Sequence, residues 1–175
     1  MYKVKGKPWA YSGAIDVSDC ATAKEVMLKA GLNFNVAKCE LVGKMPIKLT
    51  GTDEELDRII KEQKEGTHVF GTDIYRKCDN AFATYRTDYN IPLGVVKSKY
   101  TIVQNNDAFN FFDDAIGKNS AIWQTAGFWG NGERIFVSAK LPNNILVKGD
   151  PVENYLVFTN THDGSCLLYT SPSPR

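Results

Sequence analysis

Apolar residues recur along the chain with two different periods, and each period predicts its own kind of element. Helical spacing places apolar side chains three and four residues apart. It predicts three helices, over residues 24–30, 52–65 and 107–116. A period of two is typical of strands with one buried face. It predicts about seven strands, distributed over residues 33–42, 68–85, 93–103, 121–141, 145–147 and 155–158.

Turn and cap residues set the boundaries of these elements. Ser18, Asp19 or Thr22 can cap the first helix, which ends at Gly31, and Asn105 can cap the third. Asn131 and the glycine after it favour a tight hairpin turn. Many strands joined as hairpins, with a few helices between them, indicate an α+β fold with a mostly antiparallel sheet. We expect residues 1–165 to form a single α+β domain.

Composition narrows the class of protein further. The chain has 175 residues, 21 Lys+Arg against 20 Asp+Glu, and 43% hydrophobic residues, which is enough for one globular core. Its apolar runs are far shorter than the roughly 18 residues of a membrane span, so we expect no membrane partner. The four cysteines form no CxxC pair and no signal peptide is visible. Reduced thiols and a cytoplasmic location are therefore predicted.

The last ten residues, 166–175, differ abruptly from the rest. They read CLLYTSPSPR, which resembles the translation of a transposase-based sequencing adaptor. We interpret this segment as a non-native tail and set it aside. On this interpretation, residues 1–165 are the N-terminal part of a longer natural protein.

Several short motifs occur in a characteristic order along the chain. They include LGVV, KYTIVQN, TAG, GERIFV and NTHDGS, at residues 93–96, 99–105, 125–127, 132–137 and 160–165. This series resembles the phage/plasmid-like proteins grouped as domain of unknown function family 932, over most of residues 8–165. The resemblance implies a protein of a phage, plasmid or integrated element, located in a bacterial host. It implies no activity, cofactor or catalytic residue, and members of the family continue beyond the motifs present here.

His162 and Asp163 form the most suggestive pair for metal or acid–base chemistry. Adjacent strand residues point to opposite faces, so the pair would have to converge in a turn. A hydrogen-bonded loop with a packed histidine is the structural alternative, and we favour it. No HExxH motif, phosphate-binding glycine loop or nucleophile elbow is present, so no cofactor is predicted and a non-enzymatic role is favoured.

Basic and aromatic residues alternate on two of the predicted strands. Lys97 and Lys99 share one face, and Arg134, Phe136 and Lys140 share another. Cations that follow phosphates, with aromatic rings that stack on bases, are typical of sites for single-stranded nucleic acid.

Our leading hypothesis is therefore a mobile-element accessory protein that binds single-stranded DNA through an open sheet face, in replication or recombination. One alternative is a metal-dependent enzyme that uses His162 and Asp163. Another is an assembly module in which exposed Trp and Phe side chains form an oligomer interface.

Overall fold

A computed structural model describes residues 13–46, 54, 61, 67–70, 73–116, 122–142, 145–147 and 150–165. The described residues form two helices, α1 (Ala23–Lys29) and α3 (Asn105–Ile116), and ten strands. The strands are β1 (Ala14–Asp16), β2 (Val36–Pro46), β3 (Thr67–Phe70), β4 (Asp73–Arg86), β5 (Ile91–Lys97), β6 (Ile122–Trp129), β7 (Arg134–Lys140), β8 (Ile145–Val147), β9 (Asp150–Val152) and β10 (Tyr155–Thr161). All strand pairs are antiparallel, so the predicted α+β class is confirmed.

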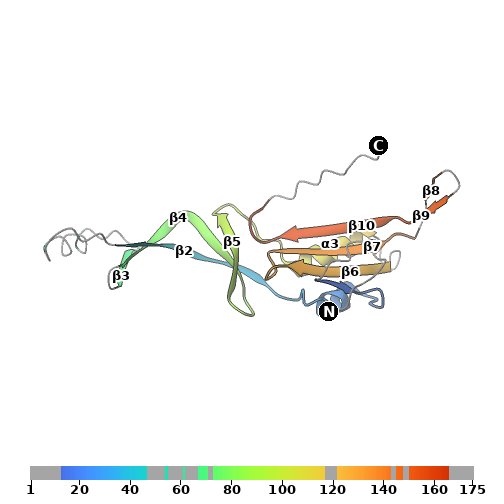
Figure 1. Cartoon of the computed structure of the whole chain (residues 1–175), viewed down its shortest axis with the longest axis horizontal. Coiled ribbons are helices and arrows are strands. Elements are labelled where there is room, and N and C mark those ends of the chain that lie inside the picture. Colours follow the sequence, from blue (N-terminus) through green and yellow to red (C-terminus); the bar gives the residue numbers. More distant parts are fainter. Residues whose placement is uncertain are drawn as a thin grey trace.

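The main sheet has the strand order β1-β6-β7-β10, and we call it the body sheet. Ile135, Val137 and Ala139 alternate along β7 and belong to the buried core. That core also contains Phe109 and Phe112 from α3 and side chains of α1, so both helices pack on this face of the sheet. In Figure 1, α3 lies alongside β7 and β10.

Local sequence signals determine both ends of α1. The Thr22 side chain accepts a hydrogen bond from the backbone N–H of Glu25, as an N-cap does. At the other end, Gly31 has φ +67°, and its N–H donates to the Leu28 carbonyl while that of Leu32 donates to the Met27 carbonyl. These two bonds form a Schellman motif, which requires a residue that tolerates left-handed backbone. Both predicted boundaries are therefore confirmed.

A second sheet extends away from the body sheet as a long twisted ribbon, which we call the arm (Figure 1). Its strand order is β2-β4-β3, with β5 paired to the part of β4 nearest the body. The pairing of β2 with β4 is interrupted once, where Leu41 faces residues 78–81. Within this bulge Asn80 adopts φ 60°.

The prediction of one sheet needs correction. The strands divide into the body sheet, the arm sheet and a two-stranded ribbon of β8 and β9. Periodicity identifies strands but carries no information on which strands pair, so the division was not visible in the sequence. Two helices lie in the described part of the chain where three were expected. The expected helix over 52–65 falls outside the described residues, except that Glu54 and Lys61 are helical, and the proposed tail at 166–175 also falls outside them.

Among the described residues, no helix is long and apolar enough to cross a membrane.

Candidate functional site

His162 lies at the end of β10 and is completely buried. Its Nε2 atom is 2.8 Å from Oδ1 of Asn105, the first residue of α3. The Asn105 Nδ2 group donates to the carbonyl oxygens of Leu32 and Phe34, at 3.0 and 3.4 Å. Because Asn105 uses its amide N–H groups there, its Oδ1 must accept a hydrogen bond from the His162 Nε2–H group. The expected N-cap role of Asn105 is therefore wrong: its side chain connects β10 to the loop after α1.

This arrangement leaves His162 neutral. With the proton on Nε2, the Nδ1 atom carries a lone pair, and it has no hydrogen-bond partner among the described residues. Burial lowers the pKa of His162 to about 4, although the nearby Asp163 carboxylate acts in the opposite direction. Within the described residues, no three His, Cys, Asp or Glu side chains come together as a metal site would require. The packed-histidine interpretation fits this geometry, and the metal-site alternative gains no support from it.

The segment around His162 joins the body sheet to the arm. The Thr84 hydroxyl of β4 donates to the His162 carbonyl at 2.6 Å, and the Tyr100 hydroxyl donates to the Thr161 carbonyl at 2.8 Å. Gly94 of β5 lies so close to Asp163 that an added Cβ would be 2.5 Å from the Asp163 Cα. The motif at residues 160–165 therefore serves as a structural junction between the two sheets.

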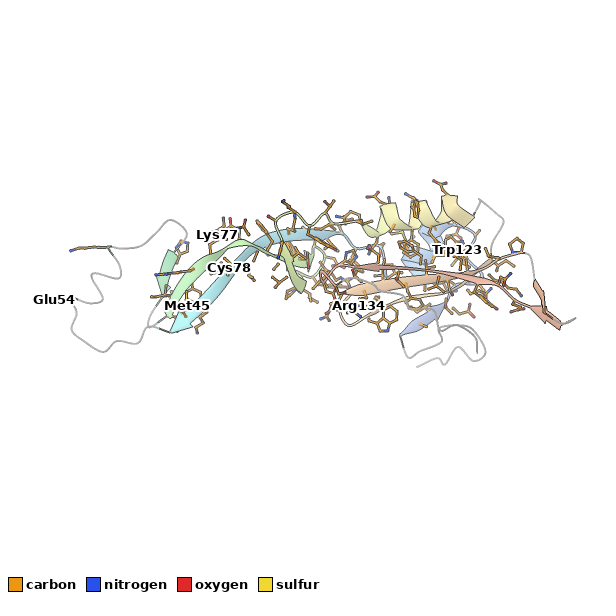
Figure 2. The ribbon with its side chains drawn as sticks, turned by 90° about the horizontal axis from the view of Figure 1, so that it is seen from above. Met45, Glu54, Lys77, Cys78, Trp123 and Arg134 are labelled. Carbon is orange, nitrogen blue, oxygen red and sulfur yellow. The ribbon has the colours of Figure 1, made fainter. Side chains whose placement is uncertain are left out.

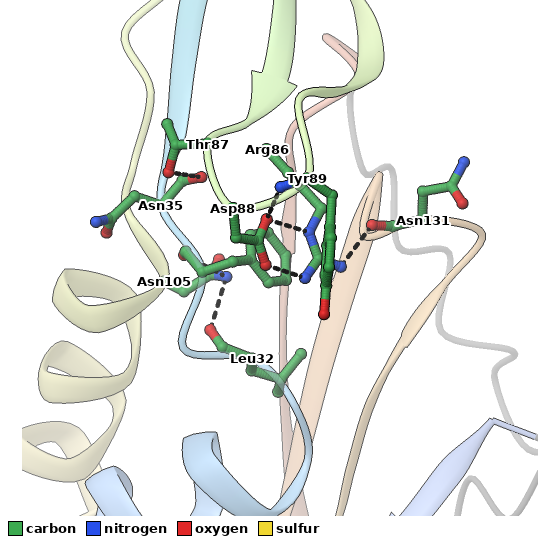
Figure 3. A network of polar contacts seen from close by, with 9 residues as sticks. Leu32, Asn35, Arg86, Thr87, Asp88, Tyr89, Asn105 and Asn131 are labelled. Carbon is green, nitrogen blue, oxygen red and sulfur yellow. Dashed lines mark hydrogen bonds and ion pairs between the residues drawn. The ribbon is translucent and has the colours of Figure 1, made fainter.

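Arg86 forms a second connection at the same junction (Figure 3). Its guanidinium pairs with both carboxylate oxygens of Asp88, at 3.0 and 2.6 Å, and donates to the Asn131 carbonyl at 2.8 Å. It also lies over the Phe34 ring, 3.9 Å from the centroid. The Arg86 charge lowers the pKa of the Asp88 carboxyl through the hydrogen bond between them. Arg86 is buried and each of its three guanidinium nitrogens donates to an acceptor within the chain, so we infer that it positions the arm and does not bind a ligand.

The predicted site on β7 does not present an open face. Phe136 is completely buried and its ring contacts that of Trp129, with 5.0 Å between the centroids. Ser138, on the same face, is also buried and lies 2.6 Å from the Thr125 hydroxyl. Phe136 therefore cannot stack on a base in this structure, which corrects our expectation of an exposed ring. The alternation along β7 showed two faces but could not show that both are covered.

The two cations of the β7 site are paired with carboxylates. Arg134 Nε is 3.3 Å from Asp163 Oδ2, and Lys140 forms an ion pair with Glu153. Burial raises the pKa of Asp163, but hydrogen bonds from Ser165 and the Arg134 charge outweigh it, and the net shift is downward. The pKa of Glu153 is lowered, first of all by its hydrogen bond with Lys140. Both cations are thus already engaged within the chain.

The other predicted cations lie where the arm meets the body, and we call this place the arm root. Lys97 is exposed at the end of β5, and Lys99 is exposed in the turn that follows. The expectation that both lysines share one strand face is therefore wrong, because the strand predicted over 93–103 ends at Lys97. The Lys38 ammonium of β2 donates to the carbonyls of Ser98 and Tyr100, at 3.2 and 2.7 Å. These carbonyls are neutral, so the Lys38 charge is not cancelled.

The arm root also offers an aromatic ring. The Lys38 ammonium lies 5.7 Å from the centroid of the partly exposed Phe82 ring. Sequence reasoning missed both Lys38 and Phe82, because their approach to the turn depends on the pairing of β2 with β4. The structure thus places the Lys38 ammonium and the Phe82 ring at a turn that carries Lys99. Lys97 comes just before this turn, but its register partner is Ala81, so it lies on the opposite face of the strand pair from Phe82.

The fold and the junction define an antiparallel α+β protein with a helix-covered body sheet and a projecting arm. Residues 92–172, which include β5, α3 and the body strands β6, β7 and β10, match the family model described as "Domain of unknown function (DUF932)". Over residues 92–172 the resemblance stated from the sequence is therefore confirmed, and the phage or plasmid origin that it implies stays a prediction. Comparisons with curated proteins and with solved structures gave no match.

Proposed function

We propose that this protein binds single-stranded nucleic acid at the arm root, as an accessory protein in replication or recombination of a mobile element. Lys97, Lys99 and Lys38 would contact phosphates, and Phe82 would pack against a base. The observation that carries the proposal is the position of the Lys38 ammonium, which lies beside the Phe82 ring and against the exposed turn that follows Lys97 and contains Lys99.

The charge distribution supports this location. The whole chain is nearly neutral, with 21 basic and 20 acidic residues. The described arm residues, 36–46, 67–70 and 73–100, hold seven Lys or Arg and only four Asp or Glu. Because the excess of positive charge lies on one extended element, a polyanion is expected to bind there in preference to the rest of the surface. On β7, by contrast, Arg134 and Lys140 have carboxylate partners and Phe136 is buried.

A fluorescence-anisotropy titration tests the proposal. Labelled single-stranded and double-stranded oligonucleotides are titrated with the 175-residue chain at two salt concentrations. We expect salt-dependent binding that prefers the single strand. Replacing Lys97 and Lys99 with Gln should weaken binding and reduce the slope of log K against log salt by about 0.7 for each phosphate contact that is lost.

A matched control separates local contacts from total charge. Lys24→Gln removes a positive charge from an exposed position on α1, away from the arm. It should leave affinity and salt slope unchanged. If Lys24→Gln weakens binding as much as Lys97→Gln or Lys99→Gln, the arm root is not the site. If the unmodified chain binds neither form of DNA, the proposed function is wrong.

A further inference from the structure

The outer part of the arm carries a second set of cations and rings on one face. Lys44 is paired in register with Tyr75, and Phe70 of β3 is paired with Asp73. Lys77 is paired in register with Val42, which lies two residues before Lys44 on β2. Directly paired and alternate strand residues share a face, so Lys44, Lys77, Tyr75 and Phe70 lie on the same side of the arm.

Side-chain contacts confirm that this face continues to the arm root. Lys77 forms an ion pair with Glu40, which lies two residues from Lys38 on β2. Lys38 in turn lies over Phe82, which is the register partner of Glu40. The outer residues therefore share one continuous surface with Lys38 and Phe82 of the arm root, and we call this surface the arm face. Figure 2 shows Lys77 and Met45 along the projecting ribbon, far from Trp123 and Arg134 in the body.

Cations and rings follow one another along the arm face. From the root outward come Lys38 with Phe82, then Lys77, then Lys44 beside Tyr75, and finally Phe70. Phe70 is 79% exposed, so its ring is open to solvent. Lys38 and Lys44 are six positions apart, which corresponds to about 20 Å of extended strand.

The carboxylates on this face do not prevent an anion from binding. Lys44 is 2.8 Å from Asp73, and Lys77 is paired with Glu40, but both lysine side chains remain substantially exposed, at 59% and 42%. Exposed ion pairs of this kind contribute only about 0–1 kcal/mol, so a phosphate can compete for the lysine at little cost. Together with Lys38, these residues give three positive and two negative charges, so the net charge of the group is positive.

We propose that a single strand of DNA lies lengthwise along the arm face, from the arm root to Phe70. Lys77 and Lys44 would hold its phosphates, and Tyr75 and Phe70 would stack on its bases. This inference rests on the proposed function and extends the site from one turn to the length of the arm. Stacking on rings without base-edge contacts makes the binding independent of sequence.

The test uses variants on the two faces of the same strand. Lys77→Gln and Lys44→Gln each remove one cation from the arm face. Arg76→Gln is the matched control, because Arg76 is exposed, lies next to Lys77 in the chain and is paired with Gly43 on the opposite face. Tyr75→Leu removes a ring but keeps an apolar side chain. Affinity is measured by anisotropy with oligothymidylates of about 5 and about 15 nucleotides, which bracket the usual site sizes.

We expect Lys77→Gln and Lys44→Gln to weaken binding of the longer oligonucleotide and to lower its salt slope, while Arg76→Gln does neither. Tyr75→Leu should weaken binding of the longer oligonucleotide roughly five-fold to a hundred-fold, as the loss of one stacked base predicts. The shorter oligonucleotide, which the arm root alone can hold, should respond mainly to Lys97→Gln and Lys99→Gln.

Three outcomes would overturn the inference, and they differ in what they leave standing. If only the arm-root variants weaken binding, the outer arm is not in the site and the proposed function survives. If Arg76→Gln weakens binding as much as Lys77→Gln does, the net charge of the arm alone determines affinity and the DNA does not bind to one particular face. If the unmodified chain does not bind the longer oligonucleotide, the inference and the proposed function fail together.

Discussion

The buried His162 makes the stability of this protein dependent on pH in a range that can be calculated. Its pKa is about 4 in the folded chain against an ordinary value of 6.5, because burial disfavours the charged imidazolium. The unfolded chain therefore takes up a proton at higher pH than the folded chain does. The stabilisation is fully present above pH 6.5 and is lost as the pH falls toward 4.

The size of the effect follows from the pKa difference. At roughly 1.4 kcal/mol per pKa unit, a shift from 6.5 to about 4 corresponds to about 3 kcal/mol, of which about 2 kcal/mol is lost by pH 5. The structure explains why the folded state cannot reduce the free-energy cost of protonating the buried His162. Protonation must occur at Nδ1, which has no acceptor among the described residues, while Asn105 holds Nε2.

The measurement is urea unfolding followed by tryptophan fluorescence at about pH 7.5 and about pH 5, a range in which most carboxylates stay ionised. The free energy of unfolding of the unmodified chain should fall by about 2 kcal/mol between them. His162→Gln keeps an N–H donor for Asn105 but does not titrate, so its stability should change much less. His68→Gln removes an exposed histidine and should retain the full dependence. Equal pH dependence in the unmodified chain and His162→Gln would refute the reasoning.

Two further substitutions probe the junction between the sheets. Gly94→Ala would place a Cβ within 2.5 Å of the Asp163 backbone, so we expect a loss of about 1–3 kcal/mol in urea unfolding, and an unchanged midpoint would contradict the close approach. Arg86→Lys keeps the charge but loses the two-point contact with its carboxylate, and should cost about 2–3 kcal/mol. The same change at the half-exposed Arg134 should cost less than about 1 kcal/mol, and equal losses at both arginines would argue against the buried network.

Elements governed by neighbours in the chain could be predicted from the sequence. The cap at Thr22 and the left-handed residue at Gly31 act over a few residues, and both ends of α1 follow from them. The hairpin of β6 and β7 likewise follows from its turn. The strand predicted over 33–42 does continue as β2, but to Pro46, because the partner strand β4 supports it further than its own pattern indicates.

Features that depend on contacts between distant residues could not be predicted. Asn105 looked like a helix cap because its neighbours begin a helix, yet its side chain is held by partners more than 50 positions away in either direction. Phe136 looked exposed because alternation reveals faces without showing what covers them. Lys38 reaches the turn after β5 only through the register of β2 on β4.

The bulge in β4 also affects how relatives of this chain should be aligned. Phe82 and Lys77 are five residues apart, so in a regular strand they would point to opposite sides, but the bulge returns Lys77 to the side of Phe82. If the pairing with β2 is otherwise kept, a relative with one residue fewer at 78–81 would present its equivalent of Arg76 where this chain presents Lys77, and one with one residue more would present its equivalent of Cys78 there. Residues aligned with positions 73–77 therefore lie on the same face of the arm only in chains whose bulges have the same length. This holds whatever the percentage identity of the two chains.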